Sequence, residues 1–186
     1  SKKLAKMDIK NEDEANNALD KVRKSSFNLT KIVSKRVKRN PLAPFTTSTL
    51  QQEASNKLGF GASRTMRIAQ KLYEGVNIGS ETTGLITYMR TDGVQLSSQA
   101  IEELREEIIN RHGKDYIPQI PIVYKSKAAN AQEAHEAIRP TSISRDPEDM
   151  SQYLDTEQLK LYELIWKRTI SSQMQSAELD LSLIHI

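Results

Sequence analysis

A tyrosine, an arginine and an aspartate lie within five positions of one another, at Tyr88, Arg90 and Asp92. A tyrosine hydroxyl keeps its proton at neutral pH, so it is a poor nucleophile unless a nearby group favours the phenolate. In an extended chain Tyr88 and Arg90 would project from the same face, because side chains alternate along a strand. The guanidinium could then favour the phenolate and hold a phosphate through two parallel hydrogen bonds. The pair suits attack of a tyrosine on a phosphodiester, although a packed tyrosine beside a solvated arginine has the same spacing.

A histidine and a second arginine, His135 and Arg139, lie downstream in a segment that ends at Pro140. The pattern predicts a short helix over 130–138, because a proline disfavours helical angles at the residue before it. Residues four apart share a helix face, so His135 and Arg139 would lie together if the helix extended that far. His135 could donate to a phosphate oxygen and move a proton near neutral pH. The alternative is a histidine whose hydrogen bonds are satisfied within a buried turn.

These side chains require rigid elements to position them. The apolar residues before Tyr88 predict a short buried strand from Leu85, closed by Gly93, and the ends of rigid elements commonly carry chemistry. Elsewhere apolar residues recur mainly with the helical period, so we predict an α+β fold that is mainly helical. Predicted helices cover 11–24, 48–58, 63–74, 98–112 and 156–174, and further predicted strands cover 4–10, 27–39 and 177–186.

Several boundaries follow from capping residues. Asn11 is the expected N-cap of the first helix, Ser48 with Gln51 fits a capping box, and Ser63 is expected to cap the third helix. The stretches 77–83 and 146–150 are predicted to be polar connections, and Tyr73 is predicted to point inward. Trp166 is interpreted as a core residue rather than a platform for a nucleic-acid base.

Two parts of the chain could contact a polyanion. The helices on either side of 59–61 (GFG) resemble a helix-turn-helix, although ordinary helix packing explains the spacing equally well. Arg64, Arg67 and Lys71 lie near one face of the second of these helices and could follow a DNA backbone. The stretch 31–39 is the most basic part of the sequence, and either a DNA-facing strand or a solvated strand edge fits it.

The composition is compatible with a nucleic-acid partner without requiring one, since the 186 residues carry a formal charge of +3. The chain has no cysteine, which excludes disulfides and cysteine–metal sites and fits a reducing compartment. No apolar run approaches the roughly 20 residues that a membrane span needs, so no membrane partner is expected.

Three blocks of the sequence resemble the type IA DNA topoisomerases and occur in the same order. They are 44–52 (PFTTSTLQQ), 84–92 (GLITYMRTD) and 132–141 (QEAHEAIRPT). The resemblance covers nearly the whole chain, from about Asp8 to Asp180. With Met89 this segment resembles the bacterial topoisomerase I branch, because the topoisomerase III branch usually has proline at this position. Gly93 stands where many members have serine, and we expect this difference to be harmless.

The resemblance implies a transesterification in which Tyr88 attacks a phosphate of single-stranded DNA. A 5′-phosphotyrosine link and a free 3′-hydroxyl would result, and the reaction would need no ATP. Arg90 would stabilise charge on the phosphate, and His135 would orient or protonate it. Further DNA contacts are expected from Arg139, Thr87, Asp92, Arg64, Arg67 and Lys71. The expected protein is a monomer that relaxes negatively supercoiled DNA in the bacterial cytoplasm, at the nucleoid.

The resemblance also implies a division into domains. Residues 1–40 would be a partial piece of the strand-rich arch that opens the DNA gate, 41–176 the tyrosine domain, and 177–186 a strand returning to the arch. The final residues, 181–186, depart from the family pattern and are interpreted as an artefact of a truncated gene, so His185 is not a candidate site residue. We expect the chain to be a central fragment of a larger protein.

The Mg²⁺ site of the family needs a glutamate and alternating aspartates, in a toprim domain. No Asp-x-Asp occurs here, and the acidic group at 12–14 is better explained by a helix start. The ligands of Mg²⁺ are therefore expected outside this chain, no metal site is predicted within it, and the chain alone is expected to be inactive.

Two other functions remain compatible with part of the pattern. A helical DNA-binding module without catalysis would explain the glycine turn and the basic helix face. A tyrosine recombinase or relaxase would also form a tyrosine–phosphate link, but those enzymes need arginine–histidine or triple-histidine sets that the sequence does not contain.

Overall fold

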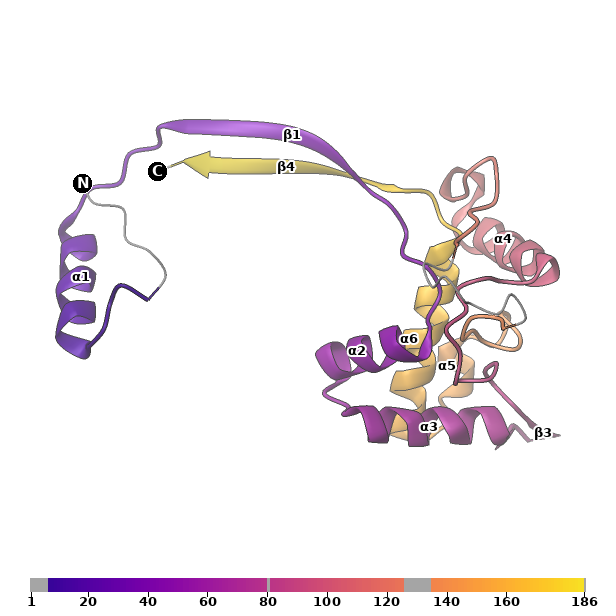
Figure 1. Cartoon of the computed structure of the whole chain (residues 1–186). Helices are drawn as coiled ribbons and strands as arrows, with labels where there is room; N and C mark the ends of the chain where they lie inside the picture. The colour runs from indigo at the N-terminus through magenta and orange to yellow at the C-terminus, as the bar shows by residue number, and fades with distance from the viewer. Residues whose placement is uncertain (1–6, 80, 126–134, 186) are drawn as a thin grey trace. The chain divides into compact units, whose positions relative to one another are not determined.

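The computed structural model describes residues 7–79, 81–125 and 135–185, and the chain divides into two units. The ribbon unit comprises Ser1–Val37 and Glu178–Ile186, and the helical unit comprises Lys38–Ala177 (Figure 1). The elements in order are α1 (Glu12–Lys24), β1 (Lys31–Arg39), α2 (Thr47–Leu58), α3 (Ala62–Glu74), β2 (Val76–Asn77), β3 (Thr82–Thr83), α4 (Ser98–His112), the 3-10 turn η1 (Lys114–Tyr116), α5 (Pro147–Met150), α6 (Thr156–Ser172) and β4 (Ala177–His185). A mainly helical α+β fold is confirmed.

The ribbon unit is a helix and a two-stranded sheet in which β1 pairs with β4 (Figure 1). In α1 the Asn11 side chain accepts the backbone N–H of Glu14 at 2.9 Å, as the sequence predicted, and no residue of this helix is buried. The strand predicted over 27–39 begins only at Lys31. The strand predicted over 4–10 is wrong for residues 7–10, which are irregular, and its first three residues lie outside the described part.

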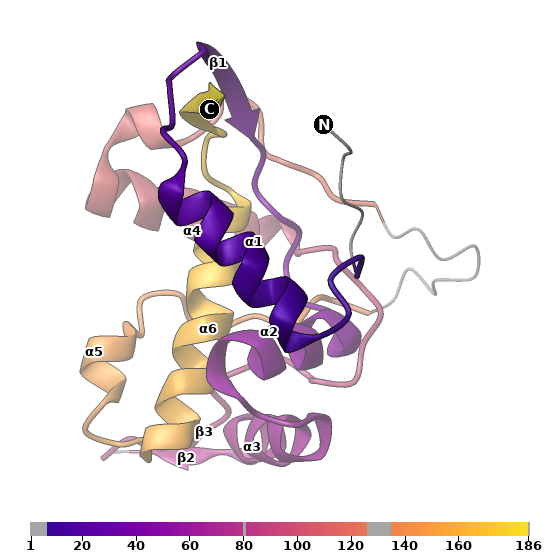
Figure 2. The same cartoon turned by 90° about the vertical axis from the view of Figure 1, so that its left-hand side faces the viewer.

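The helical unit is built around α6. Helices α2, α3 and α5 all contact it, with α5 on a different side from α2 and α3 (Figure 2). Leu161 and Ile165 of α6 are fully buried against Leu50 of α2 and Leu72 of α3. This apolar core makes α6 the fixed support for the two helices that follow one another through the glycine turn.

Polar side chains in this core have partners, as burial requires. The indole N–H of Trp166 donates to the Ile143 carbonyl oxygen at 2.9 Å, and the side chain is 8% exposed, which confirms Trp166 as a core residue. Tyr162 is fully buried and its hydroxyl donates to the Arg145 carbonyl oxygen at 2.7 Å. Burial raises the pKa of Tyr162 above its ordinary value.

Arg168 of α6 fixes the segment that leads into α2. Its Nε donates to the Ala43 carbonyl oxygen at 2.6 Å, its Nη1 lies 3.3 Å from Glu53, and its guanidinium lies 4.7 Å from the ring centre of Phe45. The first residues of α2 are therefore held against the core before the helix begins.

Both predicted caps of the glycine-linked helices are wrong. Helix α2 begins at Thr47 because Thr46 and Thr49 form a reciprocal capping box, so the hydroxyl of Thr46 takes the place predicted for Ser48. Helix α3 begins at Ala62, after Gly61, which has no side chain to cap it, rather than after Ser63.

Three other local predictions are wrong as well. Strands β2 and β3 pair antiparallel within the stretch predicted as a loop, with Val76 paired to Thr83. The four-residue helix α5 replaces the polar connection after Asp146, whose side chain accepts the Glu148 N–H at 2.7 Å. Tyr73 is 42% exposed instead of pointing inward.

No helix in the described part of the chain is both long and apolar enough to cross a membrane.

Candidate active site

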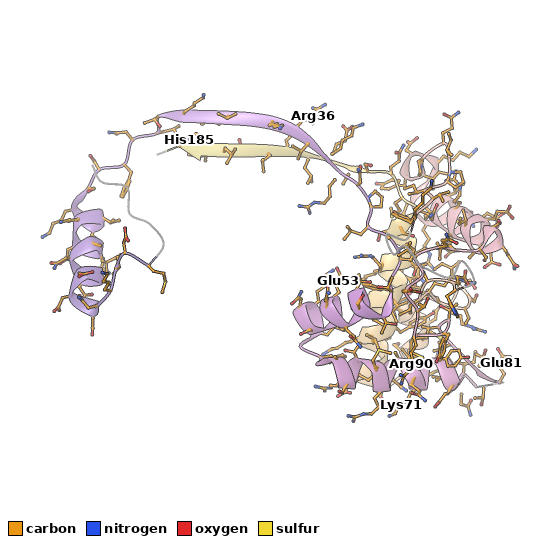
Figure 3. The ribbon with its side chains drawn as sticks, viewed as in Figure 1. Arg36, Glu53, Lys71, Glu81, Arg90 and His185 are labelled. Atoms are coloured by element: carbon orange, nitrogen blue, oxygen red, sulfur yellow. The ribbon has the colours of Figure 1, made fainter. Side chains whose placement is uncertain are left out.

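The Tyr88 segment is not the predicted strand, and the chain bends at Thr87, Met89 and Arg90. Its only β-type pairing among the described residues is an isolated bridge between Ile86 and Pro140. Leu85 and Met89 are buried, at 0% and 3% exposure, whereas Tyr88 is 47% exposed and the neighbouring Arg90 is exposed (Figure 3). The apolar residues hold the segment on the core and leave the two candidate side chains, Tyr88 and Arg90, at the surface.

The residues before Tyr88 are fixed by backbone hydrogen bonds to other parts of the helical unit. The Leu85 N–H donates to the Leu72 carbonyl oxygen of α3 at 2.7 Å, and the Leu85 carbonyl oxygen accepts from the Thr141 N–H at 3.0 Å. The Thr87 N–H donates to the Arg139 carbonyl oxygen at 2.9 Å. The third sequence block thus supports the second one directly.

The residues after Tyr88 are fixed by a single residue. Thr47, the first residue of α2, bonds to Met89 and Thr91 through its hydroxyl and its N–H. Tyr88 therefore lies between two anchored stretches, one tied to Arg139 and the other to α2.

The ring of Tyr88 has a neighbouring ring from α3. The ring centres of Tyr73 and Tyr88 are 5.3 Å apart and meet edge to face at 63°. Gly84 packs against the backbone of Tyr73, because a Cβ atom on Gly84 would lie 2.5 Å from the Tyr73 carbonyl oxygen. An edge-to-face pair of this kind favours one orientation of the tyrosine ring.

A cavity of about 630 Å³ brings the three sequence blocks together. Its lining residues are Thr47, Ser48, Gln51, Arg90, Thr91, Asp92 and His135. Arg90 and Asp92, nominated from one segment, and His135, nominated from another, thus face one hollow at the N-terminus of α2. Tyr88 does not line this cavity, and its ring lies instead against Tyr73.

The segment around His135 is extended, so the predicted helix is wrong over 135–138, while 130–134 lie outside the described residues. Glu136 forms a bridge with Gln95 and Ile138 forms one with Phe45. These pairings to other segments replace the local hydrogen bonds of a helix. His135 and Arg139 are therefore not on a common helix face.

Arg139 is held within the protein. Its Nε and Nη2 donate to the two carboxylate oxygens of Glu136 at 2.7 and 3.2 Å, and its Nη1 donates to the Pro140 carbonyl oxygen at 2.9 Å. Glu136 also accepts the Ser97 N–H at 3.0 Å. Burial alone would raise the pKa of Glu136, but the hydrogen bonds from Arg139 and Ser97 outweigh it and lower that pKa.

Gly93 lies against the backbone of His135. A Cβ atom on Gly93 would be 1.9 Å from the His135 carbonyl oxygen and 3.2 Å from the Thr91 hydroxyl oxygen. Serine cannot replace glycine here without displacing the His135 segment. The close contact explains why glycine fits at this position, and that the difference from the family pattern is harmless stays a prediction.

The side chains nominated for DNA contact differ in how they are bound. The Thr87 hydroxyl donates to the Ala137 carbonyl oxygen at 2.7 Å and accepts the Arg139 N–H at 2.9 Å, so its hydrogen bonds serve the fold. Arg64 pairs with Glu157 and lies 4.6 Å from the ring centre of Phe60. Arg67 and Lys71 are exposed on α3, and Lys71 projects away from the helix (Figure 3).

Three contributors to this geometry were not nominated from the sequence: Thr47, Tyr73 and Glu136. A run of four hydroxyl residues at 46–49, directly before a helix, was a visible signal for Thr47. Tyr73 carried no such signal, because its contact with Tyr88 depends on the hairpin between them.

The cavity contains a single carboxylate, that of Asp92. Across the described ranges no three histidine, cysteine or acidic side chains gather closely enough to hold a metal ion. A hard divalent cation prefers several oxygen ligands, so the side chains around this cavity do not fit a Mg²⁺ site by themselves.

Comparison with known proteins places this geometry in a family. The model of a family described as DNA topoisomerase matches residues 1–186. DNA topoisomerase 1 of Rickettsia bellii is 56% identical over 179 residues, which are 96% of this chain and 22% of that protein. DNA topoisomerase 1 of Helicobacter pylori is 49% identical over 175 residues, covering 94% of this chain and 24% of that protein.

A solved structure agrees. Full-length topoisomerase I from Thermotoga maritima matches with a TM-score of 0.72 and 40% identity, over 90% of this chain and 26% of that one. The chain thus spans about a quarter of the length of these relatives. The resemblance inferred from the three sequence blocks is confirmed, and this chain belongs to the DNA topoisomerase family.

Proposed function

We propose that this chain supplies the nucleophile and part of the phosphate-binding groups of a bacterial topoisomerase I. The observation that carries the proposal is the placement of Tyr88: exposed, fixed on both sides, and two residues from the cavity where Arg90 and His135 meet. Fixed geometry of this kind is what intramolecular placement of a reacting group requires.

The Tyr88 oxygen attacks the phosphorus of a single-stranded DNA phosphodiester. The new Tyr88 O–P bond forms as the bond from phosphorus to the 3′ oxygen breaks. The phenol loses its proton and the departing 3′ oxygen gains one, so the products are a 5′-phosphotyrosine and a 3′-hydroxyl. The reverse reaction reseals the strand. The free energy of the original phosphodiester stays in the tyrosine link, so no ATP is consumed.

Arg90 and His135 act on the phosphate in this proposal. A guanidinium offers paired N–H donors to phosphate oxygens, and a donor placed where charge develops lowers the barrier. His135 orients or protonates the same phosphate. Their shared lining of one cavity supports this division of roles.

Mg²⁺ would be bound by acidic ligands other than the side chains described here, and when bound it would neutralise phosphate charge. The cavity side chains do not fit it, so each step above is assigned to this chain's own groups. Asp92, the one carboxylate present, remains a proposed DNA-proximal residue.

DNA approaches over the exposed basic side chains of α3. Arg67 and Lys71 are the proposed backbone contacts, since phosphate contacts position a strand without reading its sequence. Arg64 takes part only if its ion pair with Glu157 exchanges for a phosphate. Arg139 and Thr87 contribute indirectly, because both side chains are bound within the fold.

The two units have different proposed roles. The helical unit is the tyrosine domain, and the ribbon unit is a piece of the arch that opens and closes the DNA gate. Single-stranded and negatively supercoiled DNA is the proposed substrate of the complete protein, acting as a monomer at the nucleoid.

The test uses a complete enzyme: Rickettsia bellii DNA topoisomerase 1 with its matched 179 residues exchanged for this chain, called here the exchanged enzyme. It is incubated with a single-stranded oligonucleotide labelled at its 3′ end, and the covalent product is mapped by peptide analysis. We expect the labelled DNA to be covalently attached to Tyr88. Tyr88→Phe should bind DNA but form no covalent product.

Tyr116→Phe is the matched control, because Tyr116 is 51% exposed and lies in the same unit, outside the cavity lining. Cleavage that persists in Tyr88→Phe would end the proposal. DNA binding without cleavage in the unmodified exchanged enzyme would favour a non-catalytic binding module.

A further inference from the structure

Thr47 bonds to both peptide groups that flank Arg90. Its hydroxyl oxygen lies 2.8 Å from the Met89 carbonyl oxygen, 3.1 Å from the Thr91 carbonyl oxygen and 2.8 Å from the Thr91 nitrogen. The Thr47 N–H donates to the Thr91 carbonyl oxygen at 2.9 Å. One residue thus fixes the peptide before Arg90 and the peptide after it.

The hydroxyl uses its only proton in these contacts. It has one proton, which the Met89 and Thr91 carbonyl oxygens share, and one lone pair accepts the Thr91 N–H. Thr91 is 8% exposed, so water has little access to replace these partners if the hydroxyl is removed. The Tyr88–Arg90 segment would then have unpaired groups on the side toward α2.

The position of the Thr47 hydroxyl is itself fixed. Thr47 is the first residue of α2, whose start is closed by the reciprocal bonds of Thr46 and Thr49. The N–H groups of a first helical turn lack partners within the helix, and the Thr91 carbonyl oxygen serves one of them. The helix end and the Arg90 segment therefore stabilise each other.

We infer that Thr47 is a positioning residue for cleavage, which holds Arg90 where it can meet the reacting phosphate. The inference rests on the proposed function and adds a residue to it. Thr47 acts through Arg90, because its hydroxyl is committed to Met89 and Thr91 even though the residue lines the same cavity.

The experiment measures single-turnover cleavage and oligonucleotide affinity for Thr47→Val and Thr47→Ser in the exchanged enzyme. Valine keeps the side-chain volume and removes the hydroxyl, whereas serine keeps the hydroxyl. Thr47→Val should slow cleavage by about 10- to 100-fold, the scale of a misplaced reacting geometry, with little change in DNA affinity. Thr47→Ser should restore most of the lost rate.

A double-mutant cycle with Arg90→Ala separates positioning from direct contact. If Thr47 acts through Arg90, Thr47→Val should slow an Arg90→Ala enzyme by less than about twofold, because the two losses are not additive. If Thr47→Val slows cleavage by the Arg90→Ala enzyme as much as it slows cleavage by the unmodified enzyme, the inference is wrong.

Thr49→Val is the matched control for a weakened helix start. The Thr49 hydroxyl bonds only within the capping box, to Thr46, so this variant should lose helix-start stability and slow cleavage much less than Thr47→Val does, because the Thr47 bonds to Met89 and Thr91 remain. Equal losses of rate in Thr49→Val and Thr47→Val would also overturn the inference. If Thr47→Val fails to fold, Thr47→Ala against Thr47→Ser gives the same comparison.

Failure of the proposed function gives a different result. If the Tyr88→Phe enzyme still cleaves DNA, the proposed function is wrong, and with it the reaction to which Thr47 is assigned. If cleavage requires Tyr88 but Thr47→Val does not slow it, only the positioning role of Thr47 is wrong.

Discussion

The α-carbon of Gly93 and the backbone carbonyl of His135 are so close that a Cβ atom on Gly93 would lie 1.9 Å from that oxygen. This contact joins the segment after Tyr88 to the segment that carries His135. It makes Gly93 a determinant of where His135 lies relative to Arg90 in the shared cavity.

Replacing Gly93 should move His135. We expect Gly93→Ser to destabilise this chain by about 1–3 kcal/mol, the usual cost of overpacking a close contact. In the exchanged enzyme the same change should slow cleavage. Thermal unfolding and single-turnover cleavage measure the two effects. Gly61→Ala is the control, since nothing lies within 4 Å of a Cβ atom there; equal stability losses at both positions would contradict the prediction.

Glu136 should make stability depend on pH in the acid range. Its pKa is lowered in the folded chain, so its stabilising effect is complete above the ordinary carboxyl value of about 4.3 and is lost as pH falls through the lowered value. Glu136→Gln should therefore be less stable than the unmodified chain at pH 6, with the gap narrowing below pH 4. Chemical denaturation at several pH values measures the gap.

A constant gap between pH 6 and pH 3 would show that Glu136 acts through hydrogen bonds that do not depend on its charge. Glu148→Gln provides the matched comparison, because the Glu148 side chain is exposed and its pH profile should follow that of the unmodified chain.

Tyr162 should set an alkaline limit to stability. Burial raises its pKa in the folded state, so the unfolded chain releases this proton first, and stability falls as pH rises above the ordinary tyrosine value of about 10. Tyr162→Phe should lower the free energy of unfolding by about 1 kcal/mol at neutral pH, because the hydrogen bond to the Arg145 carbonyl oxygen is lost. Above pH 10 the stability of this variant should fall less steeply than that of the unmodified chain. If the free energy of unfolding falls equally steeply above pH 10 in the two proteins, the prediction is wrong.

The chain by itself should not relax a plasmid at any Mg²⁺ concentration. Its cavity supplies one carboxylate, and its basic surface allows only weak, salt-sensitive contacts with single strands. The assay is supercoiled plasmid with Mg²⁺ and the purified chain, with Tyr88→Phe as the control for contaminating enzyme. Relaxation by the chain and not by the control would mean that an active centre is complete within it.

The candidate residues could be nominated from the sequence, whereas the contacts that hold them could not. Tyr88 and Arg90 are separated by one residue, and their exposed positions follow from the buried residues around them. The strand predicted for this segment did not form, because its partners are Thr47, Arg139 and Thr141 in place of a neighbouring strand. Hydrogen bonds between residues 42 to 57 positions apart have no signal in local periodicity.

The helix starts show the same limit at short range. Thr46, Thr47, Ser48 and Thr49 can each cap a helix, and their types alone do not choose among them. The observed start is accompanied by a contact from elsewhere in the chain, since the Thr91 carbonyl oxygen accepts the Thr47 N–H, which has no partner within the helix. The His135 segment differs from its predicted helix for a similar reason, since Glu136 and Ile138 pair with Gln95 and Phe45.

The sheet of the ribbon unit affects how the isolated chain behaves in solution. Each of its two strands keeps an outer edge, and the described residues of β4 are exposed, with Leu181 at 47%, Leu183 at 52% and Ile184 at 61%. An open strand edge with apolar side chains is a template for pairing with another chain. The purified chain should therefore self-associate as its concentration rises, and light scattering will define the range in which its DNA affinity can be measured.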